Sequence, residues 1–203
     1  MKIDIWSDFA CPFCYIGKRN MENALKEYDG EVEIEFHSFQ LDPNAKRSDT
    51  KASESLAKKY GRSVEEGQEM IDRVVNMAKD VGLNYNYDDL IETNTLKAHK
   101  LLQYAKGQGK ANDIKEELFK AHFIDAKDIS DDQVLIDIGL DLGLDQGEIL
   151  QALNSEKYQA MVETDRYEAQ QLEITSVPFF IIDNKKALQG AQPKEAFLQV
   201  FAE

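Results

Sequence analysis

The sequence lacks the basic clusters that bind anionic partners and the long apolar runs that span membranes. Among its 203 residues, Asp and Glu outnumber Lys and Arg by 38 to 24, and the formal net charge is −14 at pH 7. No block of Lys or Arg provides a surface for phosphates, so nucleic-acid binding is not expected. The longest clearly apolar run, residues 177–182, is far too short for a membrane-spanning helix, and no membrane association is expected.

A targeting segment is also lacking at the start of the sequence. Lys2 is followed by residues 3–6, whose alternation begins too early and is too short for the apolar region of a signal peptide. The sequence therefore predicts a cytoplasmic protein. In that reducing compartment a permanent structural disulfide is disfavoured, and paired cysteines favour catalysis or metal binding.

Cysteine is scarce, and the two present are Cys11 and Cys14, which enclose Pro12 and Phe13. A structural zinc site needs about four ligands. The chain offers one cysteine pair, and its histidines are scattered singly at positions 37, 99 and 122, so no metal site is predicted. Two inert core cysteines remain an alternative, but their spacing at a helix start favours a reactive dithiol.

Hydrophobic periodicity indicates strands at both ends of the chain and helices between them. We expect strands over 2–6, 31–39, 177–182 and 187–188, helices over 12–28 and 193–201, and short helices near 53–60, 64–82, 95–107, 111–124, 131–143 and 146–172. The strict alternation of 31–36 is typical of an edge strand with one solvated face. With a helix over about 156–173 before the third strand, these elements predict an α/β protein.

The order βαβ … αββα is that of a thioredoxin fold interrupted by a large all-helical insertion. We expect a discontinuous thioredoxin-like domain, 1–43 and 156–203, and an inserted helical domain over 44–155. Cys11 then stands where a strand ends and a helix begins. Unpaired N–H groups and the helix dipole favour a thiolate there. Pro12 fits the first helical turn, where its missing donor costs nothing.

These positions assign roles to the two cysteines. Cys11 is the expected attacking thiol, and Cys14, one helical turn later, is the expected resolving thiol. A second feature, Val177-Pro178, opens the third predicted strand and is expected near Cys11. A cis bond there would leave the backbone of Val177 open to a ligand, whereas an ordinary trans proline is the alternative.

Several stretches together resemble the DsbA superfamily, and more closely its cytosolic FrnE-like branch. They are residues 6–8 (WSD), 11–18 (CPFCYIGK), 37–43 (HSFQLDP), 94–99 (NTLKAH), 177–180 (VPFF) and 190–193 (GAQP). The resemblance implies dithiol–disulfide oxidoreductase or isomerase activity, a cis Pro178, and contact of Val177 with the substrate backbone. It also implies that protein or small-molecule thiols and disulfides are the partners.

The chain departs from two relatives within that superfamily. Periplasmic oxidases typically carry Pro-His where this chain has Pro12-Phe13, so one stabiliser of the Cys11 thiolate is absent. Kappa-class glutathione transferases and chromene-carboxylate isomerases generally carry serine at the position of Cys11. Asn94 and His99 lie in a motif that also resembles those glutathione users. No tightly bound cofactor is expected, and glutathione is an alternative reductant or co-substrate.

The candidate substrate-binding residues are Pro12, Phe13, Val177, Pro178, Asn94 and His99. Asn94 has the alternative role of capping the helix that begins at Thr95, and His99 that of a half-buried packing residue. Three functions stay open: a thiol–disulfide oxidoreductase or isomerase, a glutathione-dependent transferase or isomerase, and a redox-sensing binding module. The sequence allows either a monomer or a homodimer.

Overall fold

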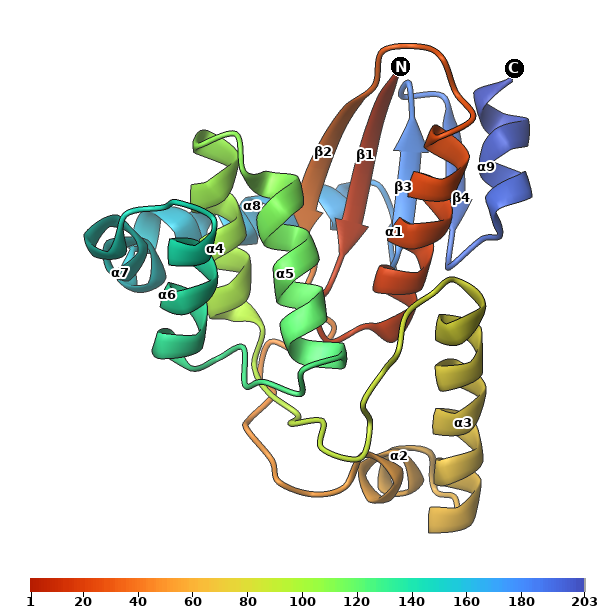
Figure 1. Cartoon of the computed structure of the whole chain (residues 1–203), viewed down its shortest axis with the longest axis vertical. Coiled ribbons are helices and arrows are strands. Elements are labelled where there is room, and N and C mark those ends of the chain that lie inside the picture. Colours follow the sequence, from red (N-terminus) through yellow and green to blue (C-terminus); the bar gives the residue numbers. More distant parts are fainter. Residues whose placement is uncertain (203) are drawn as a thin grey trace. The chain divides into compact units, whose positions relative to one another are not determined.

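The computed structural model describes residues 1–202, which form two compact units (Figure 1). The first unit joins Met1–Leu41 with the chain from Ala160 onward, and the second unit is Asp42–Gln159. The first unit thus contains both ends of the sequence, and the second is inserted between them.

The first unit is built around a four-stranded sheet. Its elements are β1 (Lys2–Ser7), α1 (Pro12–Leu25), β2 (Glu33–Ser38), most of α8 (Glu156–Gln171), β3 (Phe179–Ile182), β4 (Lys186–Gln189) and α9 (Lys194–Phe201). The strand order is β2-β1-β3-β4, with β1 parallel to β2 and antiparallel to β3. The predicted α/β thioredoxin fold is therefore confirmed, and β2 lies at an edge as its alternation indicated.

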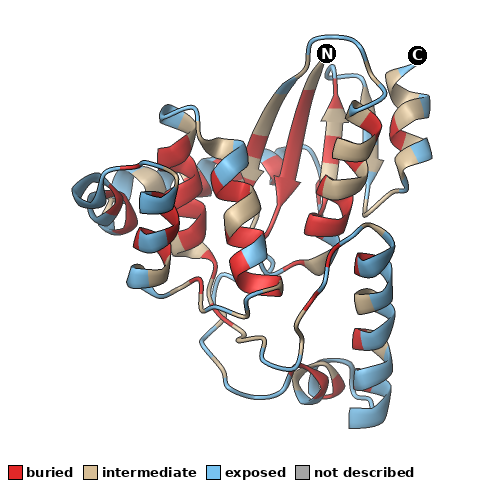
Figure 2. Ribbon diagram, viewed as in Figure 1, coloured by how far each residue is buried: buried red, intermediate tan, exposed pale blue. Residues whose placement is uncertain are grey.

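Strand register assigns the helices of this unit to opposite faces of the sheet. Ile5 pairs with Phe180, so their side chains share one face. Phe180 packs edge-on against Phe197 of α9 with ring centroids 4.9 Å apart, and a side chain at Gly17 of α1 would meet it. Trp6 points to the other face, where its indole N–H donates to a backbone oxygen of α8. Figure 2 shows the buried residues gathered in the inner strands and the first turns of α1.

The second unit contains only helices apart from one isolated bridge between Ser48 and Glu92. Its helices are α2 (Ala52–Tyr60), α3 (Val64–Asp80), α4 (Leu96–Gly107), α5 (Ala111–Phe123), α6 (Asp132–Asp141) and α7 (Gln146–Asn154), followed by the first residues of α8. Fully buried side chains such as Leu101, Leu118 and Ile149 form its core.

Several predicted boundaries differ from the structure: α1 ends at Leu25 and not near residue 28, and β2 spans Glu33–Ser38 and not 31–39. The helix expected over 146–172 is interrupted at Ser155, which adopts an extended conformation (φ −78°, ψ 131°) and accepts a hydrogen bond from the N–H of Lys157. A serine in this conformation ends α7 and starts α8. The third strand begins at Phe179, after Val177-Pro178. In the described part of the chain, no helix has both the length and the apolar composition to cross a bilayer.

Candidate active site

Local chemistry places Cys11 immediately before the first turn of α1. Cys11 is the N-cap residue (φ −94°, ψ 110°), and Pro12 occupies the first position, where no N–H is required. The backbone N–H of Cys14 donates to the Cys11 carbonyl oxygen at 3.0 Å, closing the first turn. The Cys11 side chain therefore lies at the positive end of a 14-residue helix.

Both cysteines are free thiols and both are buried, Cys11 with 4% of its surface exposed. A hydrogen bond from the Cys14 thiol lowers the pKa of Cys11 below that of an ordinary thiol. Burial opposes this shift in pKa, while the backbone N–H groups of Phe13 and Cys14 reinforce it. Burial alone would favour the neutral thiol. Because the neighbours are hydrogen-bond donors, the thiolate is stabilised in spite of its burial.

The loop before β3 contacts Cys11. The Val177–Pro178 peptide bond is cis, and the Val177 carbonyl oxygen accepts a hydrogen bond from Cys11 Sγ at 3.6 Å. The Pro178 carbonyl oxygen accepts from the N–H of Gly190 at 2.8 Å, which holds the loop to the chain after β4. Residues 166 positions apart in the sequence are thereby in contact.

Gly17 allows α1 to approach this loop closely. A Cβ at Gly17 would lie 3.0 Å from Pro178 Cγ and 3.3 Å from Phe180 Cζ. Any larger residue would therefore force Pro178 or Phe180 to move. Gly17 was not among the residues singled out from the sequence, and its only sequence signal is its place one turn after Cys14 in the quoted motif.

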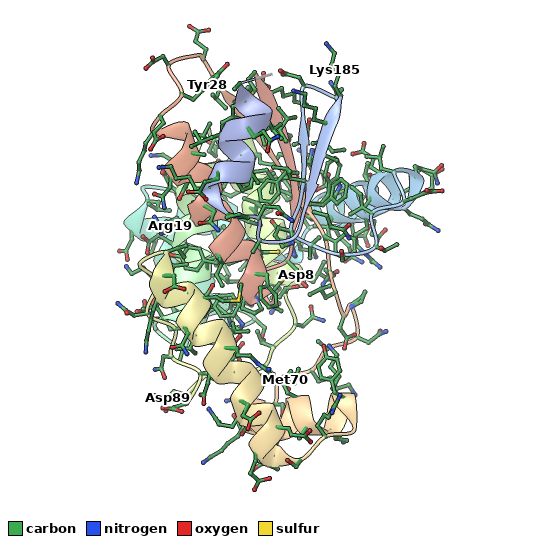
Figure 3. The ribbon with its side chains drawn as sticks, turned by 90° about the vertical axis from the view of Figure 1, so that its right-hand side faces the viewer. Asp8, Arg19, Tyr28, Met70, Asp89 and Lys185 are labelled. Carbon is green, nitrogen blue, oxygen red and sulfur yellow. The ribbon has the colours of Figure 1, made fainter. Side chains whose placement is uncertain are left out.

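A buried carboxylate near Cys11 was also missed from the sequence. Asp8 is 1% exposed, and its Oδ2 accepts the N–H of Leu41 at 2.8 Å. Its negative charge raises the pKa of Cys11, against the effect of Cys14. Figure 3 shows Asp8 near the first turn of α1, with Arg19 farther along that helix and Tyr28 beyond its other end. An acid three positions before the cysteine pair is the signal that could have identified it.

The remaining predicted site residues have different surroundings. Pro12 is half-buried, and Phe13 has 37% of its surface exposed. Asn94 and His99 belong to the second unit. The Asn94 amide donates to the carbonyl oxygens of Pro43 and Ala45, and its Oδ1 accepts the N–H of Leu96 at 2.9 Å.

These contacts give Asn94 a structural role at the start of α4, whose N-cap residue is Thr95. His99 is fully buried, more deeply than the half-buried packing residue that was the alternative to a substrate-binding role. Its position on α4 places it among the core residues Ala98, Leu101 and Leu102. Histidine is often only partly buried, and its inward-facing position on the helix decides its burial here.

A family model described as the DSBA-like thioredoxin domain matches residues 2–202. The chain belongs to this family. Its members are thiol–disulfide oxidoreductases or isomerases, and the close pair Cys11 and Cys14 agrees with that chemistry.

Individual relatives extend the likeness over the whole chain. A crystal structure of the probable DsbA oxidoreductase SCO1869 from Streptomyces coelicolor shares 35% identity, covers 100% of this chain and 88% of its own, and has a TM-score of 0.93. The uncharacterized protein YwbO from Bacillus subtilis (strain 168) is 28% identical over 198 residues, which are 96% of this chain and 92% of YwbO.

The cytosolic disulfide reductase DsbM from Pseudomonas aeruginosa, in a structure with GSH, shares only the fold. Its identity is 17%, its TM-score is 0.71, and the match covers 98% of each chain.

Proposed function

We propose that the protein is a cytoplasmic, FrnE-like thiol–disulfide oxidoreductase or isomerase in which Cys11 is the attacking thiolate and Cys14 the resolving thiol. The observation that supports this proposal best is the hydrogen bond from the Cys14 thiol, which lowers the pKa of Cys11 at the start of α1. A thiolate is the attacking species in thiol–disulfide exchange, and a second cysteine sulfur must lie within reach of the first to release the substrate.

The reaction begins when the Cys11 thiolate attacks one sulfur of a substrate disulfide. A mixed disulfide forms, the substrate S–S bond breaks, and the other substrate sulfur leaves as a thiolate that takes a proton from solvent. Cys14 then loses its proton and attacks the Cys11 sulfur. The second substrate thiol is released, the substrate has gained two electrons, and Cys11 and Cys14 are joined in a disulfide. The reverse sequence oxidises a substrate dithiol.

The loop that contains Val177 and Pro178 is the segment that we propose positions the substrate. The Val177 carbonyl oxygen is 3.6 Å from Cys11 Sγ. An extended substrate segment alongside Val177 would therefore keep its sulfur within reach of Cys11. Phe13 is exposed and adjoins the pair, so it is the side chain we propose at the rim of the substrate site.

The test uses single serine variants in an insulin-reduction assay with a dithiol reductant. Cys11→Ser should abolish turnover, because a hydroxyl is not ionised near neutral pH. Cys14→Ser should trap a mixed disulfide at Cys11, detectable by mass spectrometry as the added mass of the substrate thiol. Ala10→Ser is the matched control, since it adds a hydroxyl at the exposed neighbour of Cys11 and leaves both sulfurs in place. Undiminished turnover in Cys11→Ser would refute the assignment.

We further propose glutathione as the thiol that returns the oxidised pair to its dithiol form. Two glutathione molecules would supply the two electrons and leave as one glutathione disulfide. The presence of GSH in the structure of DsbM supports this choice. Oxidised protein mixed with glutathione should release one equivalent of glutathione disulfide per Cys11–Cys14 bond.

The same variants separate this function from the two alternatives. A glutathione-dependent transferase or isomerase would keep full activity toward electrophiles in Cys14→Ser, because only Cys11 would act on bound glutathione. A redox-sensing binding module would show no exchange reaction in the wild type. The exchange mechanism requires that both cysteines are needed for multiple turnovers.

A further inference from the structure

A second cluster of chemically active side chains lies on the sheet face that α8 covers. His37 of β2 and Asp165 and Glu168 of α8 each offer one potential ligand atom, and these atoms all lie within 4.8 Å of one another. His37 Nδ1 is 3.3 Å from Asp165 Oδ1 and 3.8 Å from Glu168 Oε2. The dithiol mechanism uses none of the three.

Neighbouring groups hold two of these ligand atoms in place. His37 Nε2 is 3.0 Å from Asp4 Oδ1, and Asp4 is itself paired with Lys2 at 2.8 Å. An ionised Asp4 accepts the proton of Nε2, which leaves the lone pair of the neutral ring on Nδ1. A carboxylate behind a histidine is the usual arrangement for a metal-ligating imidazole.

The carboxylate of Asp165 is oriented in a similar way. Its Oδ2 accepts the backbone N–H of Ser38 at 2.6 Å, so Oδ1 is the oxygen left to face His37. The His37 ring also stacks on Trp6, with centroids 4.2 Å apart and an interplanar angle of 10°. Trp6 is the cross-strand partner of His37 and donates its indole N–H to the Asp165 backbone oxygen. The ring and the carboxylate are thus both fixed by neighbouring side chains and backbone.

We propose that His37, Asp165 and Glu168 form a binding site for a divalent first-row transition metal ion, with zinc as the best match. One imidazole nitrogen and two carboxylate oxygens are donors that zinc accepts, with a water in a fourth position. Tetrahedral bonds of about 2.0–2.1 Å separate two ligand atoms by roughly 3.3 Å. The separation of His37 Nδ1 from Asp165 Oδ1 already has this value.

The exposed side of the site, at Glu168, gives an ion access to the three ligands. The side chains of His37 and Asp165 are only 12% and 11% exposed, whereas that of Glu168 is 50% exposed. Glu168 is therefore the ligand with freedom to move, and its Oε2 must come about 0.5 Å closer to His37 Nδ1 to reach the tetrahedral separation. Magnesium and calcium prefer oxygen ligands alone, so the imidazole disfavours them.

The competing explanation is a doubly hydrogen-bonded imidazolium with no metal. His37 would then carry a second proton on Nδ1 and bridge Asp4 to Asp165, with Lys2, Glu35 and Glu168 as the other charged groups nearby. In both cases the histidine joins β1 and β2 to α8. They differ in whether Glu168 is required and whether an ion is taken up.

The test is a zinc titration against a chromophoric chelator at pH 8, where a free imidazole is unprotonated. The background is the full chain with Cys11→Ser and Cys14→Ser, which removes the thiols as competing zinc ligands. We expect one zinc per chain, at least tenfold weaker binding in Glu168→Gln, and unchanged binding in Glu163→Gln. Glu163 is an exposed acid on the same helix, so its variant loses the same charge away from the site.

A crystal soaked in zinc provides a second measurement, because anomalous scattering should place a peak between the three side chains. No saturable binding in the serine background, or equal affinity in the Glu168→Gln and Glu163→Gln variants, would overturn the proposal in favour of the imidazolium bridge. Magnesium binding as tight as zinc binding would overturn the assignment to a transition metal. Loss of insulin reduction would bear on the dithiol alone, so the two proposals fail separately.

Discussion

Replacing Gly17 by alanine adds one methyl group where α1 passes Pro178 and Phe180. The new Cβ would lie 3.0 Å from Pro178 Cγ, whereas carbon atoms in favourable contact are about 3.5–4.0 Å apart. The proline ring must therefore move by roughly 0.5 Å. Phe180 Cζ, 3.3 Å from the same point, is held by its packing on Phe197 and has little freedom to move away.

Two opposing contributions set the size of the effect. Alanine is more favourable than glycine inside a helix by about 0.8–1.0 kcal/mol. Overpacking a filled core costs about 1–3 kcal/mol. The net result is a loss of roughly 0–2 kcal/mol, which for a chain of this length lowers Tm by up to about 8 °C. Because Pro178 adjoins Val177, whose oxygen contacts Cys11, we expect insulin reduction to slow by about tenfold, less than the ~100-fold associated with a 1 Å misplacement.

Gly107→Ala is the matched control in a thermal unfolding experiment. Gly107 is the last residue of α4, and a Cβ there would have no heavy atom of the described residues within 4 Å apart from its chain neighbours and the backbone of its own helix. Its Tm should be unchanged or raised, and its turnover should equal that of the wild type. The difference between the two variants, about 1–3 kcal/mol, isolates the packing cost. If Gly17→Ala raised Tm as much as Gly107→Ala, the close approach of α1 to Pro178 would be disproved.

Three further outcomes follow from charges in the structure. Asp8→Asn should lower the pKa of Cys11, so alkylation would reach its plateau at a lower pH than in the wild type; an unchanged or raised midpoint would contradict the role of Asp8. Phe13→His should lower that pKa as well and make the pair more oxidising, with each tenfold change in the glutathione equilibrium equal to about 30 mV. Burial and the Glu148 carboxylate raise the pKa of Tyr104 to about 12, so an ultraviolet titration should lose one late-titrating tyrosine in Tyr104→Phe. Because this pKa is raised, the stabilisation from neutral Tyr104 is complete below about pH 10 and is lost as pH rises toward 12.

Local signals in the sequence were sufficient for most of the fold. The alternation of 31–36 identified an edge strand, and a cysteine followed by proline marked the start of α1. These signals work because they describe the chemistry of neighbouring residues. The break at Ser155 was also local, but helix formers on both sides of the serine concealed it.

The candidate sites depended more heavily on distant contacts. His37 was counted as a singly scattered histidine, yet strand pairing places it opposite Trp6, and α8 brings Asp165 to it from 128 residues away. Asp8 and Gly17 stood within the cysteine-bearing stretch, but neither identity indicates burial or a close contact. Such roles depend on which distant residues become neighbours in the fold, and the local sequence pattern does not show this.

By itself the sequence determined the sheet-and-helix pattern, the position of Cys11 at a helix start and the presence of a second sulfur one turn later, because hydrophobic periodicity and helix capping act over a few residues. Only the tertiary structure decided that the carbonyl of Val177 faces Cys11, that the charge of Asp8 opposes the thiolate, and that His37 meets two carboxylates. Electrostatic and packing energies depend on distances through space, and chain folding sets those distances independently of separation along the sequence.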